Sequence, residues 1–600
     1  MLTQNEFKLL CSLRTAGCNL SQRQLAKRSG LSLGAVNYLR SGLAARGLLH
    51  EDNTLTEAGA SLLEEYRVDN AVILAAGMSS RFAPLAFEKP KGLLRVKGEI
   101  LIERQIRQLQ EAGIPRITLV VGYMKEKFFY LADKMGVELL INEDYYRYNN
   151  PSSLLLALDR LSNTYICSSD DYFTENVFEP YVYDSYYAAV CSEAPTKEYC
   201  LTTNAQGFIA KVTVGGGPGS WYMLGHAYFS RAFSRRFAAL LAEEYESKPN
   251  VRLELWEDFL RAHLRELPIR IRRYEPGVIH EFDTLDELRA FDRKYLENTD
   301  SRIFENIASA LHCAESEIDR IAPIKSGQTN TSFLFELRGE AYVYRHPDIS
   351  SADYIRRESE FASMQAVRPL GVDDTLIAMD AKTGWKVSRY IRQSHTLDYA
   401  DRGEVKKALA LLRSLHDAKL NTGYDFDVWQ ETLGYIRRLR GSGREDFVGA
   451  EELFELVQEL HAYVELDGVE KCLCHGNCYD KNFLVDGEGK LYLIDWEYSG
   501  RADPGCDYGT FICCSDYSET EAEQILALYY GRPLQPEELR HSFACIAIMA
   551  YYWFLWAIFL DSQDRPVGRY MYLWYRYTRQ YGEKALALYR RSTEGEDPKA

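Results

Sequence analysis

The stretch that decides the fold of the central part of the chain runs from Asp69 to Ile114 and reads "DNAVILAAGMSSRFAPLAFEKPKGLLRVKGEILIERQIRQLQEAGI". Residues 70–74 form a short apolar run, which predicts a buried strand. Ala75-Ala76-Gly77 then favours a tight turn whose backbone amides can approach a phosphate. An amphipathic helix closed by Gly113 and a strand over 116–123 follow. This βαβ order predicts a doubly wound α/β sheet with its ligand at the carboxyl ends of the strands.

Two cations follow the glycine turn at Arg81 and Lys91. The string Leu-Ala-Ala-Gly-x-x-x-Arg-x-x-Pro-Leu followed by Pro-Lys resembles the nucleotide-sugar pyrophosphorylase superfamily, and most closely its LicC-like branch, the CTP:phosphocholine cytidylyltransferases. The resemblance covers residues 69–295, and it implies a Rossmann-like nucleotidyltransferase domain. It also implies that Ala76 and Gly77 bind the nucleotide triphosphate, and that Arg81 and Lys91 do so as catalytic cations.

The reaction of that family is displacement at the α-phosphorus of CTP by a phosphomonoester oxygen, with pyrophosphate leaving. Both reactants are anions, so the site needs cations and Mg²⁺, and the metal needs hard oxygen ligands. Asp170 ends an apolar strand in "YICSSDDYF" and fits the first metal ligand; Asp171 beside it faces the other way on an extended chain. The second ligand is expected to come from Glu257, Asp258 or Asp283, although acids at helix starts are also common caps.

The segment "NEDYYRYNNPSSLLLALDRL" also resembles the family, and Asn149, Asn150 and Ser153 open a helix there. They are expected to hold the cytidine side or to order a lid. Aromatic side chains attract a trimethylammonium group through their ring faces. The candidates for phosphocholine are Trp221, Tyr222 and Trp256, with ordinary core positions as the alternative in a chain of 42 Tyr and 8 Trp.

Residues 1–66 read as three helices followed by a turn at Asp52-Asn53. This resembles a winged helix-turn-helix of the MarR type. The second helix of the helix-turn-helix pair would offer Ser32, Asn37 and Arg40 to a DNA major groove. A docking module is the alternative, because the segment has about as many acids as bases.

Residues 300–592 begin with a helix and a glycine turn between strands, "IAPIKSGQTNTSFLFELRGEAYVYRHP". Such a turn, with Gly327 and Asn330, can cover nucleotide phosphates with backbone amides. Arg345 stands where kinase-like folds place the cation for the α- and β-phosphates, with Glu358 as its expected partner. Residues 384–391, "GWKVSRYI", are expected to form the strand that joins the two lobes.

The segment 474–509, "CHGNCYDKNFLVDGEGKLYLIDWEYSGRADPGCDYG", carries the second lobe's chemistry. It resembles LicA-type choline kinases, and the resemblance covers about residues 318–577. It implies a bilobal, protein-kinase-like fold that binds ATP. Asn482 and Asp495 have the spacing to hold Mg²⁺ from the loop and the following strand.

The run 545–560, "CIAIMAYYWFLWAIFL", has no charge but is shorter than the roughly 20 residues of a membrane span, which predicts a buried core helix. Choline and ethanolamine kinases carry Trp-x-x-Trp on a late helix, the spacing of Trp553 and Trp556. Residues three apart share a helix face, so both rings can meet one choline, with Glu497 as an acid nearby. Two core tryptophans are the alternative.

Asn477 occupies the position where the kinase family carries an aspartate base. A neutral amide cannot accept the substrate's proton, and such bases contribute about 10²–10⁴-fold to rate. Phosphoryl transfer depends mainly on metal and positioning, so we expect ligand binding to persist while turnover is impaired. The asparagine is an introduced substitution, or the lobe has a sensing role, or Asp480 replaces the base. The third is least favoured, since Asp480 is expected to cap a turn.

The net charge of −16 argues against a whole-chain affinity for nucleic acid. Thirteen cysteines without paired CxxC motifs, and the lack of a signal peptide, predict reduced thiols in the cytoplasm. Taken together, we expect a multidomain α/β and α+β protein with domains 1–66, 69–295 and 300–592, which makes phosphocholine from ATP and choline and CDP-choline from CTP. Ethanolamine or an aminoalkylphosphonate as substrate, and a transcriptional regulator with enzyme-like sensors, are the alternatives.

Overall fold

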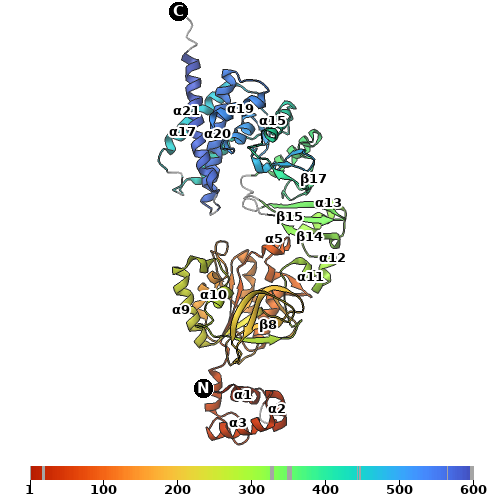
Figure 1. The fold of residues 1–600 in the computed structure, drawn as a ribbon, viewed down its shortest axis with the longest axis vertical. Helices are drawn as coiled ribbons and strands as arrows, with labels where there is room; N and C mark the ends of the chain where they lie inside the picture. Colours follow the sequence, from red (N-terminus) through yellow and green to blue (C-terminus); the bar gives the residue numbers. More distant parts are fainter. Residues whose placement is uncertain are drawn as a thin grey trace, which may run out of the picture. The chain divides into compact units, whose positions relative to one another are not determined.

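The structure is a computed structural model that describes residues 2–16, 20–324, 330–347, 355–441, 443–444, 447–563, 565 and 567–594. The chain divides into two compact units, Met1–Ile303 and Phe304–Ala600 (Figure 1).

The first unit begins with helices α1 (Gln4–Ala16), α2 (Gln22–Ser29) and α3 (Leu33–Ala45). Ser21 caps α2 and Gly30 ends it at φ 67°, as the sequence indicates. A turn then brings Leu49 and Leu55 into a β-bridge before α4 (Glu57–Glu64). Tyr66 stacks on Tyr183 at 5.4 Å between ring centroids, so this helical segment packs against the domain that follows.

The centre of the first unit is a nine-stranded mixed sheet. Its parallel part has the order β6-β1-β4-β5, and antiparallel strands extend it beyond β6. The strands are β1 (Asn70–Ala75), β4 (Ile117–Val121), β5 (Glu138–Ile141), β6 (Thr164–Ser168), β8 (Tyr186–Cys191), β9 (Thr196–Thr203), β10 (Ile209–Gly216), β11 (Trp221–Phe229) and β12 (Arg270–Tyr274). The parallel part is the doubly wound arrangement that the sequence predicts.

Apolar side chains cover both faces of this sheet and form two cores. Helix α6 (Leu101–Glu111) buries Ile102, Ile106 and Leu109 on one face, and α9 (Arg231–Ser247) buries Phe233, Phe237 and Leu241 on the other. A short antiparallel pair, β7 (Asp171–Phe173) and β13 (Ile279–Glu281), lies beside the end of β6. The carboxyl ends of β1 and β6 therefore meet the β7–β13 pair at one edge.

The second unit starts with α13 (Arg302–Leu311) and a five-stranded antiparallel sheet of order β14-β15-β16-β18-β17. Helix α14 (Arg357–Val367) belongs to this lobe. The strands of the five-stranded sheet are β14 (Ile318–Pro323), β15 (Asn330–Leu337), β16 (Glu340–Pro347), β17 (Leu376–Met379) and β18 (Lys386–Arg389). Strand β18 falls within the segment expected to join the lobes, whereas Gly327 lies outside the described residues.

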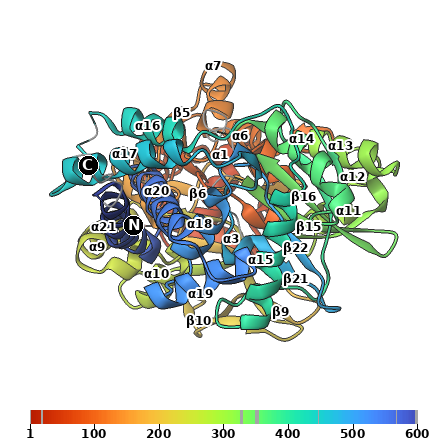
Figure 2. The same ribbon diagram turned by 90° about the horizontal axis from the view of Figure 1, so that it is seen from above.

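The rest of the second unit is mainly helical and surrounds the apolar helix α20 (Pro536–Asp561). Figure 2 shows α20 among the neighbouring helices that contact it. These are α16 (Val428–Leu439), α17 (Ala450–Asp467), α18 (Gly505–Cys513) and α21 (Arg569–Glu594). Helix α20 is long and apolar enough to cross a membrane, but almost all its apolar side chains are buried in this core, as expected for residues 545–560.

Candidate functional sites in the two units

A cavity of about 600 Å³ opens at the carboxyl ends of β1 and β6. The turn after β1 contributes Ala76 and Gly77, and the segments beyond it contribute Arg81 and Lys91. Asp170 lines the cavity directly after β6. The glycine turn, both cations and the first predicted metal ligand therefore share one cavity.

Lys91 is almost completely buried, and its ammonium group lies 2.7 Å from Asp170 Oδ2 and 3.7 Å from Asp283 Oδ1. Burial alone would lower the pKa of Lys91, but the charges of Asp170, Glu281 and Asp283 raise it above its usual value. Arg81 reaches Asp283 Oδ2 at 3.2 Å from a largely exposed position. Lys91 is thus a permanent buried cation, and Asp283 is the candidate second ligand that the fold brings to Asp170.

Two further acids were not predicted as ligands from the sequence. Glu281 lies opposite Asp171 in the β7–β13 pair. Burial, reinforced by the charge of Asp170, raises the pKa of Glu281 to about 8. Burial also raises the pKa of Asp171 well above its usual value, and neither of its carboxylate oxygens has a hydrogen-bond partner among the described residues. The spacing of Glu281 and Asp283, which points both side chains to one side of an extended chain, was the available signal.

The predicted asparagine and serine residues also reach this cavity. Asn149 and Ser153 both line it, at the start of α8 (Pro151–Leu156). Asn149 donates its backbone N–H to Arg252 O at 2.8 Å, and Ser153 Oγ accepts from Asn142 Nδ2 at 3.0 Å. These bonds fix the rim opposite the glycine turn.

Two predictions for the segment 255–259 are corrected by the structure. Trp256 is 3% exposed and stacks on Tyr187 with 5.4 Å between ring centroids, so it belongs to the core and not to a ligand cage. Glu257 accepts a hydrogen bond from Tyr187 Oη at 3.1 Å, and burial raises the pKa of Glu257 to about 7. Helix α10 (Trp256–Ala262) thus buries Trp256 and places Glu257 against Tyr187.

Trp221 and Tyr222 do not form one cage, because neighbours on β11 point to opposite faces. Trp221 packs on one core and lies 5.1 Å from the guanidinium of Arg273. Tyr222 packs on the other core, and burial together with the charges of Glu198 and Glu281 raises its pKa. Only Tyr222 therefore faces the acidic side of the site.

In the second unit, Arg345 is buried and forms a two-pronged ion pair with Glu360, at 2.5 and 2.7 Å. Glu358, the predicted partner, is exposed. The two glutamates are two positions apart on α14, so they point about 200° apart around the helix axis, and only Glu360 faces the sheet. The prediction of a β16 cation paired with the following helix is confirmed, and the partner's identity is corrected.

The Arg345–Glu360 pair belongs to a larger buried network. Lys386 Nζ lies 3.1 Å from Glu360, and Arg357 Nη1 lies 3.2 Å from both Glu360 and Glu497. Burial opposes ionisation of Glu360, but the charges of Arg345 and Lys386 hold the pKa of Glu360 far below its usual value.

Asn330 connects this network to the second lobe by donating from Nδ2 to Glu497 Oε2 at 2.8 Å. Arg345 lies 3.5 Å from Asp495 Oδ1. Glu497 is therefore bound to Asn330 and Arg357 and lies in the ion-pair network of Arg345, whereas the sequence predicts it beside Trp553 and Trp556. The packing of the two lobes, which local sequence does not encode, decides this.

The catalytic loop is held by Asp507, which accepts from the backbone N–H groups of His475 at 2.9 Å and Gly476 at 2.7 Å. Asn482 Nδ2 donates to Asn477 O at 2.9 Å, and the backbone N–H of residue 494 donates to Asn482 O at 2.9 Å. Asp495 follows at φ 70°. Asn477 and Asn482 are thus in contact, and Asp495 follows the residue that binds Asn482, with an amide where the base is expected.

Trp553 and Trp556 lie 5.4 Å apart, and Trp574 of α21 approaches both. The indole nitrogens of Trp556 and Trp574 have no hydrogen-bond partner among the described residues. Tyr570 extends the cluster by stacking on Trp574 at 5.5 Å. The two predicted tryptophans are therefore both buried and joined in one aromatic wall.

Asp480 is the acid on the side of this wall. Burial raises the pKa of Asp480, and its charge in turn contributes to the raised pKa of Tyr570. One carboxylate oxygen of Asp480 has no hydrogen-bond partner among the described residues. Asp480 also starts a 3₁₀ turn over Asp480–Asn482.

Two family matches cover the two units. Residues 71–246 match the MobA-like NTP transferase domain, and residues 320–540 match the phosphotransferase enzyme family. The chain is 35% identical over 231 residues, 38% of this chain and 93% of the relative, to a 2-aminoethylphosphonate cytidylyltransferase of Lancefieldella rimae. It is 32% identical over 222 residues, 37% of this chain and 96% of the relative, to a choline-phosphate cytidylyltransferase of Streptococcus pneumoniae.

The second unit is similar to the solved structure of the choline kinase LicA from Streptococcus pneumoniae. The identity is 24%, the similarity covers 48% of this chain and 98% of that one, and the TM-score is 0.41. Through residues 71–246 the chain belongs to the cytidylyltransferases of the MobA-like NTP transferase family, and residues 320–540 of the same chain match the phosphotransferase enzyme family.

Proposed function

We propose that the chain activates choline in two consecutive steps, ATP-dependent phosphorylation in the second unit and transfer of phosphocholine to CTP in the first. The observation that carries the proposal is the convergence of Gly77, Arg81, Lys91 and Asp170 on one cavity. Such a cavity offers backbone amides, a buried cation and carboxylates to a nucleotide triphosphate.

In the first unit, Lys91 and Arg81 would neutralise charge on the triphosphate as an incoming phosphate oxygen displaces pyrophosphate. Asp170, Asp283 and Glu281 are the proposed Mg²⁺ ligands. Acids exceed cations around Lys91, and the buried oxygens of Asp171 have no hydrogen-bond partner among the described residues, so the residues fit a divalent cation. When bound, Mg²⁺ would supply further positive charge to the phosphates.

In the second unit, Asn330 and Arg345 are proposed to hold the ATP phosphates, and Asn482 and Asp495 to hold Mg²⁺. The aromatic wall of Trp553, Trp556 and Trp574 with Asp480 is proposed to hold the ammonium group of choline, because a trimethylammonium cation prefers aromatic faces. One carboxylate oxygen of Asp480 has no hydrogen-bond partner among the described residues and is available to that cation. Asn477 orients the hydroxyl without removing its proton, so this step is slow.

The amine that the first unit accepts is the main choice left to experiment. Its relatives include both a choline-phosphate and a 2-aminoethylphosphonate cytidylyltransferase. Initial rates of pyrophosphate release from CTP with phosphocholine, phosphoethanolamine and 2-aminoethylphosphonate decide it. We expect the highest kcat/KM with phosphocholine. If kcat/KM is higher with either primary amine, the proposed substrate of both steps becomes that amine in place of choline.

A second candidate function is DNA binding by residues 1–66 as a winged helix. Helix α3 supports it, because Ser32 caps its start and Tyr38 is 80% exposed on it beside Asn37. In this alternative the two units serve a regulator as ligand sensors. A gel shift with DNA upstream of the gene, with and without CDP-choline, tests it; no shift in either condition excludes it.

We also place the protein in the cytoplasm. The twelve cysteines of the described residues are free thiols, most of them buried, which suits a reducing compartment that also supplies ATP and CTP.

A further inference from the structure

A cluster of three metal-ligand side chains lies in the second unit, apart from the catalytic loop. His541 and Cys545 are one turn apart on α20, and Asp503 immediately precedes α18. His541 Nε2 lies 3.1 Å from Asp503 Oδ2 and 3.5 Å from Cys545 Sγ. With zinc bonds of about 2.0–2.3 Å, tetrahedral geometry places oxygen and nitrogen ligands about 3.3 Å apart, and nitrogen and sulfur ligands about 3.6 Å apart. The observed distances fit edges of such a tetrahedron.

The surroundings of His541 orient it as a metal ligand. Its other ring nitrogen, Nδ1, lies 2.8 Å from Asp467 Oδ2 at the end of α17. A carboxylate on the far nitrogen fixes the tautomer that leaves Nε2 free to bind a metal. Tyr589 of α21 donates to the same Asp467 oxygen. The carboxylate that orients the histidine is therefore already in place.

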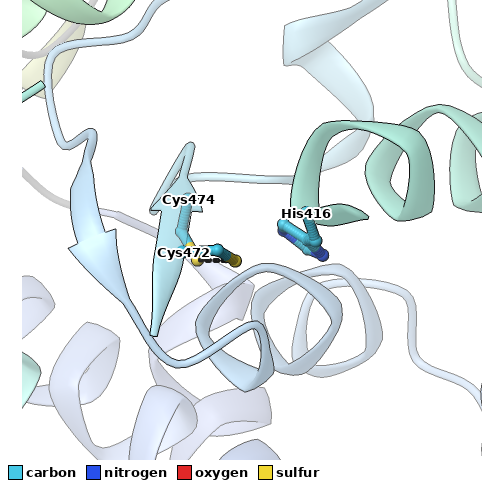
Figure 3. Close-up of side chains that lie close together, drawn as sticks. All are labelled: His416, Cys472 and Cys474. Atoms are coloured by element: carbon cyan, nitrogen blue, oxygen red, sulfur yellow. Dashed lines mark hydrogen bonds between the residues drawn. The ribbon is translucent and has the colours of Figure 1, made fainter. Parts of the chain in front are cut away.

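A similar cluster nearby lacks this arrangement. Figure 3 shows His416 of α15 (Arg402–Asp417) facing Cys472 and Cys474 of strand β20 (Cys472–Cys474). His416 Nε2 is bound to Asp507 at 2.9 Å and Nδ1 to Tyr529 Oη at 2.7 Å. Neither of these partners belongs to the cluster, and Asp507 also holds the catalytic loop. A metal at Cys472 and Cys474 would have to displace that support, so this cluster serves as the control.

The groups of the first cluster also suit a divalent cation, because a thiolate, a carboxylate and an imidazole are ligands that zinc binds. Metal binding at such a site releases the protons that its ligands carry. A cavity of about 60 Å³ lined by Asp503 and Cys545 opens beside the cluster and has room for a water molecule as a further ligand.

We propose that Asp503, His541 and Cys545 bind a zinc-class divalent metal ion that ties α18 to α20. Asp503 Oδ1 accepts from the backbone N–H of Gly505 at 2.7 Å, so its other oxygen is left for the metal. Asp507 lies one turn further along α18, where it holds His475 and Gly476. The ion would thereby stabilise the helix end that supports the catalytic loop. Its role is structural and does not depend on which amine the enzyme accepts.

The test is Co²⁺ titration of the full chain after treatment with a chelator. Carboxylate sites for Mg²⁺ also bind Co²⁺, but only a cysteine ligand gives a thiolate-to-cobalt charge-transfer band. We expect this band to saturate at one equivalent in the unchanged protein, to vanish in Cys545→Ser and to persist in Cys474→Ser. Zn²⁺ should displace the cobalt and raise the melting temperature of the second unit.

No band in the unchanged protein, or loss of the band in Cys474→Ser but not in Cys545→Ser, would overturn the proposal. If Cys545→Ser does not fold, Asp467→Asn tests the proposed site instead, because this variant keeps all three metal ligands. Loss of such an orienting carboxylate should weaken cobalt affinity by about 10–100-fold. Unchanged affinity in Asp467→Asn would likewise contradict the proposed site.

Discussion

Lys91 combines almost complete burial with a neighbourhood of acids. Its ammonium group is 2.7 Å from Asp170, and the charges around it keep it protonated. The ammonium group is therefore already held in place before a triphosphate binds. Charged groups that are held in place before the reaction stabilise developing charge most effectively.

Replacing this cation tests its role directly. Lys91→Met keeps an unbranched side chain that is one atom shorter and removes its charge, and we expect kcat for pyrophosphate release from CTP to fall by about 10²–10³-fold. Lys211→Met, at an exposed position on β10, is the matched control and should keep full activity. A loss below tenfold in Lys91→Met would remove Lys91 from the catalytic machinery.

Asn477 poses the complementary question in the second unit. The loop around it is held by Asp507 and Asn482, yet its side chain cannot act as a base. We expect Asn477→Asp to raise the rate of choline phosphorylation by about 10²–10⁴-fold. Asp480→Asn in the otherwise unchanged chain tests Asp480 as the alternative base. If this variant loses the remaining rate of choline phosphorylation while its affinity for choline is unchanged, Asp480 accepts the proton. Equal rates in the unchanged chain and in Asn477→Asp would contradict our account.

At the scale of the element, helices α20 and α21 build the aromatic wall. Trp556 is 9% exposed and its indole nitrogen has no partner among the described residues, so a ligand can use both its ring and its N–H group. Trp556→Ala should raise KM for choline about 2–30-fold, the equivalent of one cation–π contact of about 0.5–2 kcal/mol.

The matched variant is Trp556→Phe, which keeps a ring face and should retain most of the affinity. The two variants are compared by steady-state kinetics at saturating ATP. If Trp556→Ala lowers kcat and leaves KM unchanged, Trp556 is a core residue without a role in binding the amine.

Strand β11 carries a different kind of buried group, His226, whose Nε2 lies within hydrogen-bond distance of Tyr186 Oη at 2.9 Å and Tyr274 Oη at 3.4 Å. Burial lowers the pKa of His226 to about 3. The unfolded chain takes up a proton below about pH 6.5, whereas the folded state does so only near pH 3, so acid favours the unfolded state. The contribution of His226 to stability is therefore fully present above pH 6.5 and is lost progressively as the pH falls towards 3.

Between pH 6.5 and pH 5 this linkage amounts to about 2 kcal/mol of unfolding free energy for the first unit. Urea unfolding at the two pH values, followed by cytidylyltransferase activity, measures it. His226→Phe fits the surrounding aromatic rings and should remove most of this pH dependence. An equally steep dependence in His226→Phe would assign the effect to other groups.

At the scale of the whole molecule, the two sites lie in separate compact units, so each step should fail alone. With choline, ATP and CTP supplied together, Lys91→Met should stop at phosphocholine, and the unchanged chain should proceed to CDP-choline. Product analysis by mass spectrometry distinguishes the outcomes. CDP-choline formed at the normal rate by Lys91→Met would show that the first unit does not carry the second step.

Local sequence determined the loops and the elements that carry them: the glycine turn after β1, the end of β6 at Asp170, the catalytic loop and the apolar helix α20. Each depends on a few consecutive residues whose periodicity or backbone freedom fixes the local structure. The pairings across the fold were not available in this way. Glu281 faces Asp171 because two distant strands pair, and Glu360 replaces Glu358 because the packing of α14 selects one helix face.

The aromatic wall and the ion-pair network around Glu360 differ in the same way in how far local sequence predicts them. Trp553 and Trp556 were predicted together because their spacing places them on one helix face, but Glu497 was assigned to them and instead binds Asn330 and Arg357. The sequence by itself thus determined which chemical groups this protein has and on which elements they lie. Only the tertiary structure decided which of those groups meet, because contacts between residues far apart in the chain depend on how elements pack and not on the order of their residues.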